Sequence, residues 1–295
     1  VQKKRDIVGA VEQISSKDIA DRIGSYQNVS RSLQGAIPGL TVTFSDGKPT
    51  RGASFQVRGA NSIGAGGSAL ILVDGVETDI TTVNSEDIES ISVLKDASST
   101  AVYGSRGTFG VILITTKRPE KGQMKITYNG SYNFYKRTVT PELVDNGYDW
   151  TTSYLEAYTN SYATDPTNIN NVFRFSRAWY SELERRNSDP SYEKWRINPA
   201  DNRYEYFGNT NWYKIFYKDY TTGHQHNLSI TGGTDKASYY VSGRFFHQDG
   251  IYNAGDERYN QYNVLAKGTV QATKWLRVEN TTSFMSRFSH QPTLT

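Results

Sequence analysis

Residues Asp87–Lys117 read DIESISVLKDASSTAVYGSRGTFGVILITTK. Apolar residues fill a first strand candidate at Ile91–Leu94 and a second at Val111–Ile114, each a short run bounded by turn signals. Between them lie small residues and then a loop in which glycine recurs regularly, at Gly104, Gly107 and Gly110. Glycine lets the backbone adopt positive φ and pass close to another segment. The stretch therefore predicts a strand, a turn or short helix, a closely packed loop and a second strand.

A glycine-rich loop of this kind also occurs in phosphate-binding sites, but the context here is against one. A dinucleotide site or P-loop needs a helix directly after the loop, whereas an apolar run typical of a strand follows Gly110. The stretch also lacks the Gly-Lys-Ser/Thr ending of a P-loop. The loop is thus not a nucleotide-binding motif.

The residue pattern of the same stretch is long and distinctive. Residues 88–117 follow the pattern IES-x-x-VLKDAS-x-x-A-x-YG-x-RG-x-x-GVI-x-ITTK. Three shorter signatures precede it: LQG-x-IPGL at Leu33–Leu40, VRG at Val57–Gly59 and LVDGV at Leu72–Val76. Together these motifs resemble the plug domain of TonB-dependent outer-membrane receptors, in the wording of the SusC/RagA-like branch. The resemblance marks as plug-motif positions Gly59, Asp74, Gly75, Asp96, Tyr103, Gly104, Arg106, Gly107 and Gly110.

The resemblance also implies an ionic lock between plug and barrel. In the wider receptor family, the arginine of an Arg-Gly motif contacts glutamates inside the barrel, and a second basic residue joins it. Arg58 matches the first position, and Lys95 stands at the second, where arginine is commoner. Lysine is a point charge that cannot form a bidentate pair. The alternative is an ordinary surface cation at each of the two positions.

The chain changes character after Gly122. In MKITYNGSYNFYKR (124–137), apolar and aromatic residues alternate with small polar ones, which places the two sets on opposite faces of a strand. The same period of two returns in HNLSITGGT (226–234), SYYVSGRFF (238–246), QYNVLAKGTVQA (261–272) and LRVENTTSFMSRF (276–288). Tight connections at 232–237 and 272–274 alternate with a longer one at 253–257 and an insert at about 138–223. Short turns on one side and long loops on the other are typical of outer-membrane barrels.

We therefore predict a mixed α/β plug domain at 1–121, followed at 122–295 by the first antiparallel transmembrane strands of an outer-membrane β-barrel. Plugged barrels have about 22 strands, and an unpaired edge in lipid is costly. We expect the barrel to be incomplete in this chain and further strands to lie beyond Thr295. A soluble antiparallel sandwich with one wet face per sheet accounts for the alternation equally well.

The composition excludes several classes of protein and of binding site. The 295 residues include no cysteine, which excludes disulfides and thiolate metal sites. A net charge of +3 is too mild to indicate nucleic-acid binding. The sequence has no uninterrupted apolar run long enough for a transmembrane helix. The resemblance implies a TonB box upstream of the plug.

The long insert is rich in aromatic residues. We expect two helices in it, near Asp149–Tyr158 and Phe173–Arg186. Trp150 and Trp179 are candidates to stack on a ligand, although large aromatics more often pack into a core of their own. In the plug, we expect Asn61, Ser62 and Gly66, which lie in or next to a glycine-rich loop, to face the ligand.

The sequence shows no arrangement of catalytic residues, so we predict a protein that is not an enzyme and holds no cofactor or metal. Among the histidines, His224 and His226 share one face of a strand, but no third metal ligand is suggested nearby. We interpret them as a polar strand end. Asp87 and Glu89 suggest a solvated strand edge or ion pairs.

The resemblance implies active import of glycans or oligopeptides across the outer membrane. The implied partners are a SusD-like surface lipoprotein, the TonB–ExbB–ExbD complex, outer-membrane lipid and a second receptor in a SusC2D2-type dimer. Two other classes stay open from the sequence: a soluble all-β carbohydrate-binding module and an accessory domain of an extracellular enzyme. Membrane fractionation separates the importer from both.

Overall fold

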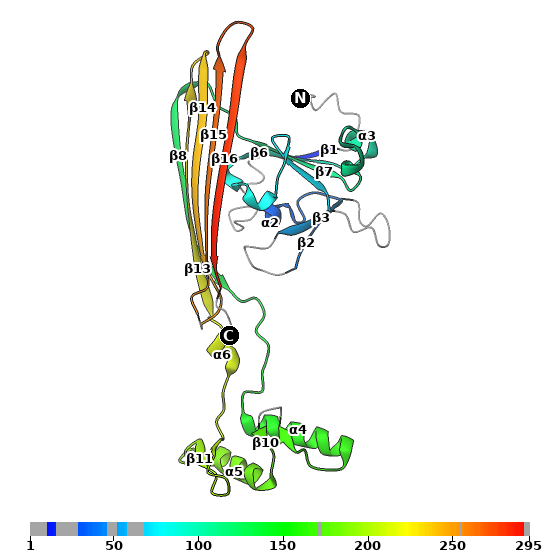
Figure 1. The fold of residues 1–295 in the computed structure, drawn as a ribbon, viewed down its shortest axis with the longest axis vertical. Coiled ribbons are helices and arrows are strands. Elements are labelled where there is room, and N and C mark those ends of the chain that lie inside the picture. Colours follow the sequence, from blue (N-terminus) through cyan, green and yellow to red (C-terminus); the bar gives the residue numbers. More distant parts are fainter. Residues whose placement is uncertain are drawn as a thin grey trace. The chain divides into compact units, whose positions relative to one another are not determined.

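The computed structural model describes residues 11–15, 29–45, 52–57, 68–169, 173–253 and 255–291 (Figure 1). The chain divides into two compact units. The first contains Val1–Tyr135, Thr221–Gly250 and Asp256–Thr295, and the second contains Lys136–Tyr220 and Ile251–Gly255.

The part of the first unit before Gly122, here called the N-terminal domain, is built on a five-stranded mixed sheet with the order β1-β6-β7-β4-β5. Only β4 and β7 pair in parallel; the other neighbours are antiparallel. A separate antiparallel pair is formed by β2 and β3. The strands are β1 (Val11–Ser15), β2 (Leu40–Phe44), β3 (Ala53–Val57), β4 (Leu70–Val73), β5 (Val76–Glu77), β6 (Ile88–Leu94) and β7 (Val111–Thr116).

Short helices connect these strands: α2 (Val29–Leu33), η2 (Ile80–Thr82), η3 (Ser85–Asp87), α3 (Ala97–Thr100) and η4 (Ala101–Gly107). The predicted order of strand, short helix, loop and strand in residues 87–117 is confirmed. Apolar side chains of β2, β3, β6, β7 and α2 form one buried cluster, in which Leu33, Ile91 and Ile112 are fully buried. The domain thus has an ordinary dry core of its own.

The glycine loop packs against its own domain, as the spacing suggested. Gly104 and Gly110 have φ of 58° and 91°, which side chains rarely tolerate. A Cβ on Gly107 would come within 2.8 Å of the Thr100 carbonyl oxygen, and one on Gly110 within 2.6 Å of the Val57 side chain. The loop therefore needs glycine both for its conformation and for close packing.

The second sheet of the first unit, here called the long sheet, has the order β16-β15-β14-β13-β8 (Figure 1). Its strands are β8 (Gly122–Lys136), β13 (Tyr220–Gly233), β14 (Ala237–Asp249), β15 (Arg258–Gln271) and β16 (Arg277–His290). From β13 to β16, each strand pairs antiparallel with the next in the chain. Short turns join β13 to β14 and β15 to β16, while β14 and β15 are joined by a longer loop.

The two faces of the long sheet differ, and the predicted alternation is confirmed. On β14, Tyr240, Ser242 and Phe246 are buried, whereas Tyr239 and Val241 are exposed. A sandwich requires a second sheet packed on the first. In the described part of the chain, the five strands instead form one sheet whose buried face hydrogen-bonds to the N-terminal domain. The arrangement matches barrel strands beside a plug.

The second unit contains three helices: α4 (Gly147–Tyr162), α5 (Arg177–Ser188) and α6 (Trp212–Phe216). Two short hairpins accompany them, β9 (Asn168–Ile169) with β10 (Phe173–Arg174), and β11 (Trp195–Ile197) with β12 (Tyr204–Tyr206). The second predicted helix begins later than expected. Its first turn starts at Arg177 because Ser176 caps it by accepting a hydrogen bond from the backbone of Trp179.

The interior of the second unit is built around Phe207, which is 3% exposed. The indole of Trp179 stacks on its ring with centroids 5.9 Å apart. The guanidinium groups of Arg186 and Arg196 lie 4.9 and 5.6 Å from the same ring. Both arginines also pair with Glu182. Cation–π contacts and ion pairs thus replace a large aliphatic core in this unit.

No helix among the described residues is long and apolar enough to cross a membrane.

Candidate functional site: the interface between the N-terminal domain and the long sheet

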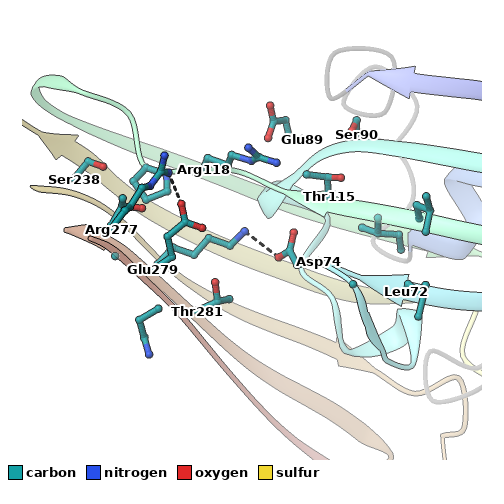
Figure 2. A pocket seen from close by; sticks show the side chains of 18 of the residues that line it. Leu72, Asp74, Glu89, Ser90, Thr115, Arg118, Ser238, Arg277, Glu279 and Thr281 are labelled. Carbon is teal, nitrogen blue, oxygen red and sulfur yellow. Dashed lines mark ion pairs between the residues drawn. The ribbon is translucent and has the colours of Figure 1, made fainter. Parts of the chain in front are cut away.

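One polar contact between the N-terminal domain and the long sheet is centred on Asp74. Its carboxylate accepts hydrogen bonds from the backbone N–H (3.0 Å) and the hydroxyl (2.6 Å) of Thr116. The ammonium of Lys267 on β15 lies 2.9 Å from the same carboxylate (Figure 2). Lys267 also donates to the Thr116 carbonyl oxygen at 3.3 Å. Three residues distant in sequence thus form one closed ring of contacts, here called the Asp74 latch.

The local sequence explains why Asp74 stands there. Asp74 and Gly75 form the two-residue turn between β4 and β5, with φ of 49° and 90°. Asp-Gly is a preferred pair for such a turn because both positions need positive φ. Since β4 runs parallel to β7 with Val73 opposite Ile114, the turn brings the carboxylate beside the last residue of β7. The turn therefore sets the latch geometry.

The electrostatics of Asp74 follow from these partners. Burial raises its pKa, but hydrogen bonds from Thr116 and the charge of Lys267 outweigh burial, so the net pKa lies below the ordinary value of 3.8. The carboxylate is therefore ionised throughout the physiological range. Lys267 is 9% exposed, so its charge is largely removed from water and depends on this partner.

A second group of contacts involves the turn that contains η2 and η3. Asn84 donates through its side-chain amide to Asp87 at 3.0 Å and to Asn227 on β13 at 2.8 Å. The hydroxyl of Tyr240 on β14 donates to Asp87 at 2.8 Å. All four side chains are at most 3% exposed. The expectation of a solvated edge at Asp87 is wrong, because the long sheet covers this carboxylate and Tyr240 and Asn84 satisfy it.

Backbone carbonyls of the same turn meet β15. The side-chain amide of Gln261 donates to the Thr81 carbonyl at 3.3 Å, and that of Asn263 donates to the Thr82 carbonyl at 2.7 Å. Gln261 and Asn263 also bond to each other at 3.0 Å. These amides and Lys267 occupy alternate positions of one strand, so a single face of β15 makes all of these contacts.

The interface is therefore polar and hydrogen-bonded, in contrast to the dry core of the N-terminal domain. Such contacts can be exchanged for hydrogen bonds to water one at a time, with a small net change in free energy for each. An apolar interface would instead expose its whole surface to water when it separates. The arrangement suits a domain that is held firmly at rest and is able to part from its neighbour.

A hollow of about 1450 Å³ lies beside the latch, between the N-terminal domain and the end of the long sheet near its short turns (Figure 2). Polar and apolar side chains line it in about equal measure, and two of its charged pairs are Lys267 with Asp74 and Arg277 with Glu279. Hydroxyl groups from both sides contribute to it: Ser90, Thr115, Ser238 and Thr281. The hollow has no arrangement of acid, base and nucleophile.

Comparison with known proteins identifies the fold and the family. A family model described as the TonB-dependent receptor plug domain matches residues 3–111. TonB-dependent receptor P3 of Formosa agariphila is 32% identical over 282 residues, which make up 94% of this chain and 23% of that receptor. TonB-dependent receptor SusC of Bacteroides thetaiotaomicron is 41% identical over 145 residues, covering 45% of this chain and 14% of that protein. The chain belongs to the SusC-like TonB-dependent receptors.

Solved structures agree with this family. The RagAB peptide importer in its closed-closed state matches with a TM-score of 0.70 at 27% identity, covering 96% of this chain and 31% of that chain. The siderophore receptor PirA from Acinetobacter baumannii matches with a TM-score of 0.53 at 15% identity, over 95% of this chain and 32% of that chain, which shows the fold alone. The chain spans less than a third of each of these relatives.

Within this receptor chain, the predicted lock residues fall in different places. Arg58 lies outside the described residues, as do Gly59, Asn61, Ser62 and Gly66. The ammonium of Lys95 donates to the Pro38 carbonyl within the N-terminal domain. The buried ion pair at Asp74 has the opposite polarity, because its lysine belongs to the long sheet and its aspartate to the N-terminal domain. The lock at Arg58 and Lys95 stays a prediction.

The other motif residues build the N-terminal domain. Tyr103 packs against the cluster that contains Leu94 and Val111. Arg106 pairs with Glu77 of β5. The backbone carbonyl of Asp96, at the start of α3, accepts hydrogen bonds from the N–H groups of Ser99 and Thr100. Asp74 also contacts the long sheet, through Lys267.

The two tryptophans predicted to face a ligand have different surroundings. Trp179 packs on Phe207 inside the second unit. Trp150 is 43% exposed and begins a row of rings along α4. It stacks on Tyr154 at 5.6 Å, and the row continues through Tyr158 to Tyr162. The row is exposed at its two ends and half-buried at Tyr154 and Tyr158, and it is the better candidate for a ligand contact, whereas Trp179 has a structural partner.

The histidines show what strand pairing adds. His224 lies opposite His247 on β14, with ring centroids 5.1 Å apart, although the sequence suggested no third metal ligand near His224 and His226. His226 hydrogen-bonds to the hydroxyl of Tyr128 instead of standing free. Across the described ranges, no group of three or more histidine and carboxylate side chains could hold a metal ion.

Sequence reasoning missed most residues of the interface. The residues not singled out before are Asn84, Thr116, Asn227, Tyr240, Gln261, Asn263 and Lys267. A signal was present, because polar side chains recur at every second position of β15, from Gln261 through Asn263 to Lys267 with one apolar interruption. That pattern marks a face that meets polar groups, but it does not say which groups.

Proposed function

We propose that this chain supplies the plug and first wall strands of a TonB-dependent importer that takes up glycans or oligopeptides across the bacterial outer membrane. The observation that supports this most is the polar interface at Asp74 and Asp87. It holds the N-terminal domain, which has an apolar core of its own, against the long sheet through hydrogen bonds and an ion pair. A permanent domain contact would gain more from apolar burial.

In this proposal, the N-terminal domain blocks the lumen and the exposed face of the long sheet meets lipid. Residues such as Ile126, Leu228, Val241 and Val264 stand on that face and are 41–58% exposed in this chain. A ligand enters from the side of the long insert. Force from an energised TonB–ExbB–ExbD complex then rearranges the N-terminal domain, and water replaces its hydrogen bonds to the wall as they part.

The substrate class and the partners are part of the proposal. One relative is SusC, and a structural neighbour at 27% identity is a peptide importer, so both glycans and oligopeptides are kept as substrates. A SusD-like lipoprotein would cover the long-loop side, where the exposed row from Trp150 to Tyr162 offers a contact for the ligand. Assembly as a SusC2D2-type dimer completes the proposal.

The test uses the full-length receptor in its own cell. The gene is deleted, and growth is measured on maltooligosaccharides and on casein peptides as sole carbon or nitrogen source. The proposal expects a defect on one of the two that the wild-type gene restores only when TonB is present, with the receptor in the outer-membrane fraction. Growth restored without TonB, or a receptor found in a soluble fraction, contradicts the proposal and favours a soluble carbohydrate-binding module.

The predicted lock at Arg58 adds a separate test. Arg58→Ala is expected to raise the permeability of the full receptor to large antibiotics such as vancomycin, because a lost charge pair loosens the plug. Vancomycin sensitivity is compared at equal receptor levels in the outer membrane. Unchanged sensitivity would argue against a lock at this residue. Lys95→Ala is tested in the same way.

A further inference from the structure

We infer that the hairpin of β11 and β12 in the second unit is a carbohydrate-binding site, on which sugar rings stack against exposed aromatic side chains. The inference rests on the proposed function and adds to it a substrate class, a glycan, and a contact site separate from the row of rings on α4. Four side chains of the hairpin are here called the aromatic platform: Trp195, Ile197, Tyr204 and Tyr206.

The two faces of this hairpin are reversed relative to those of an ordinary surface hairpin. The four side chains of the platform share one face, because Trp195 pairs directly with Tyr206 and Ile197 with Tyr204. They are 43–61% exposed. The opposite face carries the charged pair of the hairpin, whose side chains are only 25% and 18% exposed. A hairpin at a surface normally turns its apolar face inward, so exposed rings gathered on one face indicate a binding surface.

The charged face fixes the hairpin to the interior of the second unit. Arg196 donates to Glu205 at 2.7 Å and lies 3.4 Å from Glu182 on α5. Its guanidinium group lies 5.6 Å from the ring of Phe207. The Trp195 carbonyl oxygen also accepts a hydrogen bond from the side chain of Arg186 on α5 at 3.4 Å. The platform is therefore held from behind, and a site that is ordered before the ligand arrives binds at a lower entropic cost.

The geometry of the rings suits a chain of sugars. The rings of Tyr204 and Tyr206 are nearly parallel, with an interplanar angle of 23° and centroids 6.4 Å apart. The indole of Trp195 lies 5.6 Å from Tyr204 and is tilted by 53°. The C–H groups on one side of a pyranose form an apolar patch that packs on such a ring, while a tyrosine also offers a hydroxyl to the sugar's own hydroxyls. Among the described residues, neither of the two tyrosine hydroxyls has a hydrogen-bond partner.

The size of the platform favours an oligosaccharide over a protein partner. Its three rings, each with a surface of about 150–250 Å² and about half exposed, offer about 300 Å² for contact. A standard protein interface buries about 800 Å² on each partner. The turn next to the rings is polar, with Asp201, Asn202 and Arg203 all exposed. A few ring surfaces beside polar groups match a short glycan, which has apolar C–H patches and many hydroxyls.

Binding of oligosaccharides to the purified full-length receptor tests the inference. Maltoheptaose, cellohexaose, xylohexaose and laminarihexaose are titrated by isothermal titration calorimetry, and tryptic casein peptides are titrated in parallel. We expect at least one of the four sugars to bind, and Trp195→Ala and Tyr204→Ala each to weaken it by about tenfold, since each variant removes one stacked ring. Trp195→Phe keeps a ring and should bind within about threefold of the wild type.

Trp212→Ala is the matched control, because Trp212 belongs to the same unit and is 61% exposed but stacks on Phe216 of α6 instead of standing on the hairpin. It should leave sugar binding unchanged. Limited proteolysis shows whether the second unit stays folded in each variant. If Trp195→Ala unfolds it, Tyr204→Ala decides alone, because that ring lies on the surface with 61% of the residue exposed.

Four results overturn the inference: no binding of any of the four sugars to the wild type, equal binding to the wild type and the platform variants, an equal loss in Trp212→Ala, and a loss of peptide binding with sugar binding kept. Failure of the proposed function would show differently. Import would then not depend on TonB, while the platform would still bind sugar.

Discussion

The substitution Lys267→Met tests the Asp74 latch most sharply. Methionine keeps most of the side-chain volume but removes the ammonium that lies 2.9 Å from Asp74. Asp74 keeps its two hydrogen bonds from Thr116, and the longer 3.3 Å hydrogen bond from Lys267 to the Thr116 carbonyl is lost as well, so the main loss is one charge-assisted contact. Such a contact stabilises by about 1.5–3 kcal/mol when largely buried. The side chains of Lys267 and Asp74 are 9% and 26% exposed, so water screens their contact only a little. We therefore expect the loss of this contact to cost about 2 kcal/mol.

At 25 °C, about 1.4 kcal/mol corresponds to a tenfold change. Opening of the end of β7 should therefore become about 30-fold more frequent in Lys267→Met. The assay is hydrogen–deuterium exchange by mass spectrometry on the purified full-length receptor, read at peptides that contain residues 111–117. Their most informative amide is that of Thr116, which donates directly to Asp74.

The control is Lys121→Met, whose partner Asp235 is 94% exposed in its side chain. An exposed pair contributes at most about 1 kcal/mol, so exchange at Thr116 should change by less than about fivefold. Asp74→Asn and the double variant complete a mutant cycle, with an expected coupling of about 1–2 kcal/mol. The reasoning fails if Lys267→Met leaves exchange at Thr116 unchanged, or if the effects of the two single variants simply add.

Three other outcomes are expected. The folded-state pKa of Asp74 lies below 3.8, so the contribution of its carboxylate to stability is complete above that pH and is lost as pH falls through the folded value. Protection of the end of β7 from hydrogen exchange should therefore be flat from about pH 5 to 8 and drop below about pH 4. A loss of protection already near pH 6 would be inconsistent with this. Gly110→Ala should lower the free energy of unfolding, measured by thermal melting, by more than about 1 kcal/mol, since the new methyl group meets Val57. Gly243→Ala should lower it less, because the space around that position is open. Equal melting temperatures of the two variants would refute this. Phe207→Ala should destabilise the second unit by about 3–5 kcal/mol and expose it to limited proteolysis, and an unchanged digestion pattern would show that the ring is not its core.

Much of the fold was predictable because it depends on local pattern. The strands β6 and β7 form where the apolar runs Ile91–Leu94 and Val111–Ile114 and the turn residues around them place them. The alternation in residues 238–246 correctly separates an inner face with Tyr240 and Arg244 from an outer face with Tyr239 and Val241. A period of two follows from strand geometry alone, so no distant contact is needed to read it.

The interface was not predictable in the same way. Asp87 carries a charge next to a strand, and such residues are usually solvated; only the approach of Tyr240, 153 positions later, buries it. Asp74 was singled out as part of a turn motif, but its partner Lys267 lies on a strand whose register relative to the N-terminal domain no local signal gives. Alternation tells which face a residue occupies, whereas the docking of two sheets decides which residue it meets.

The division of the long sheet into a lipid face and an inner face can be measured directly on β14 of the full-length receptor. Single cysteines from Tyr239 to Phe246 carry an environment-sensitive fluorophore, and quenching by nitroxide lipids is recorded in bilayers. We expect strong quenching at the four odd-numbered positions, which share the outer face, and little at the four even-numbered positions. Quenching that is uniformly absent, with all positions equally open to a water-soluble quencher, would contradict a membrane wall that surrounds the N-terminal domain.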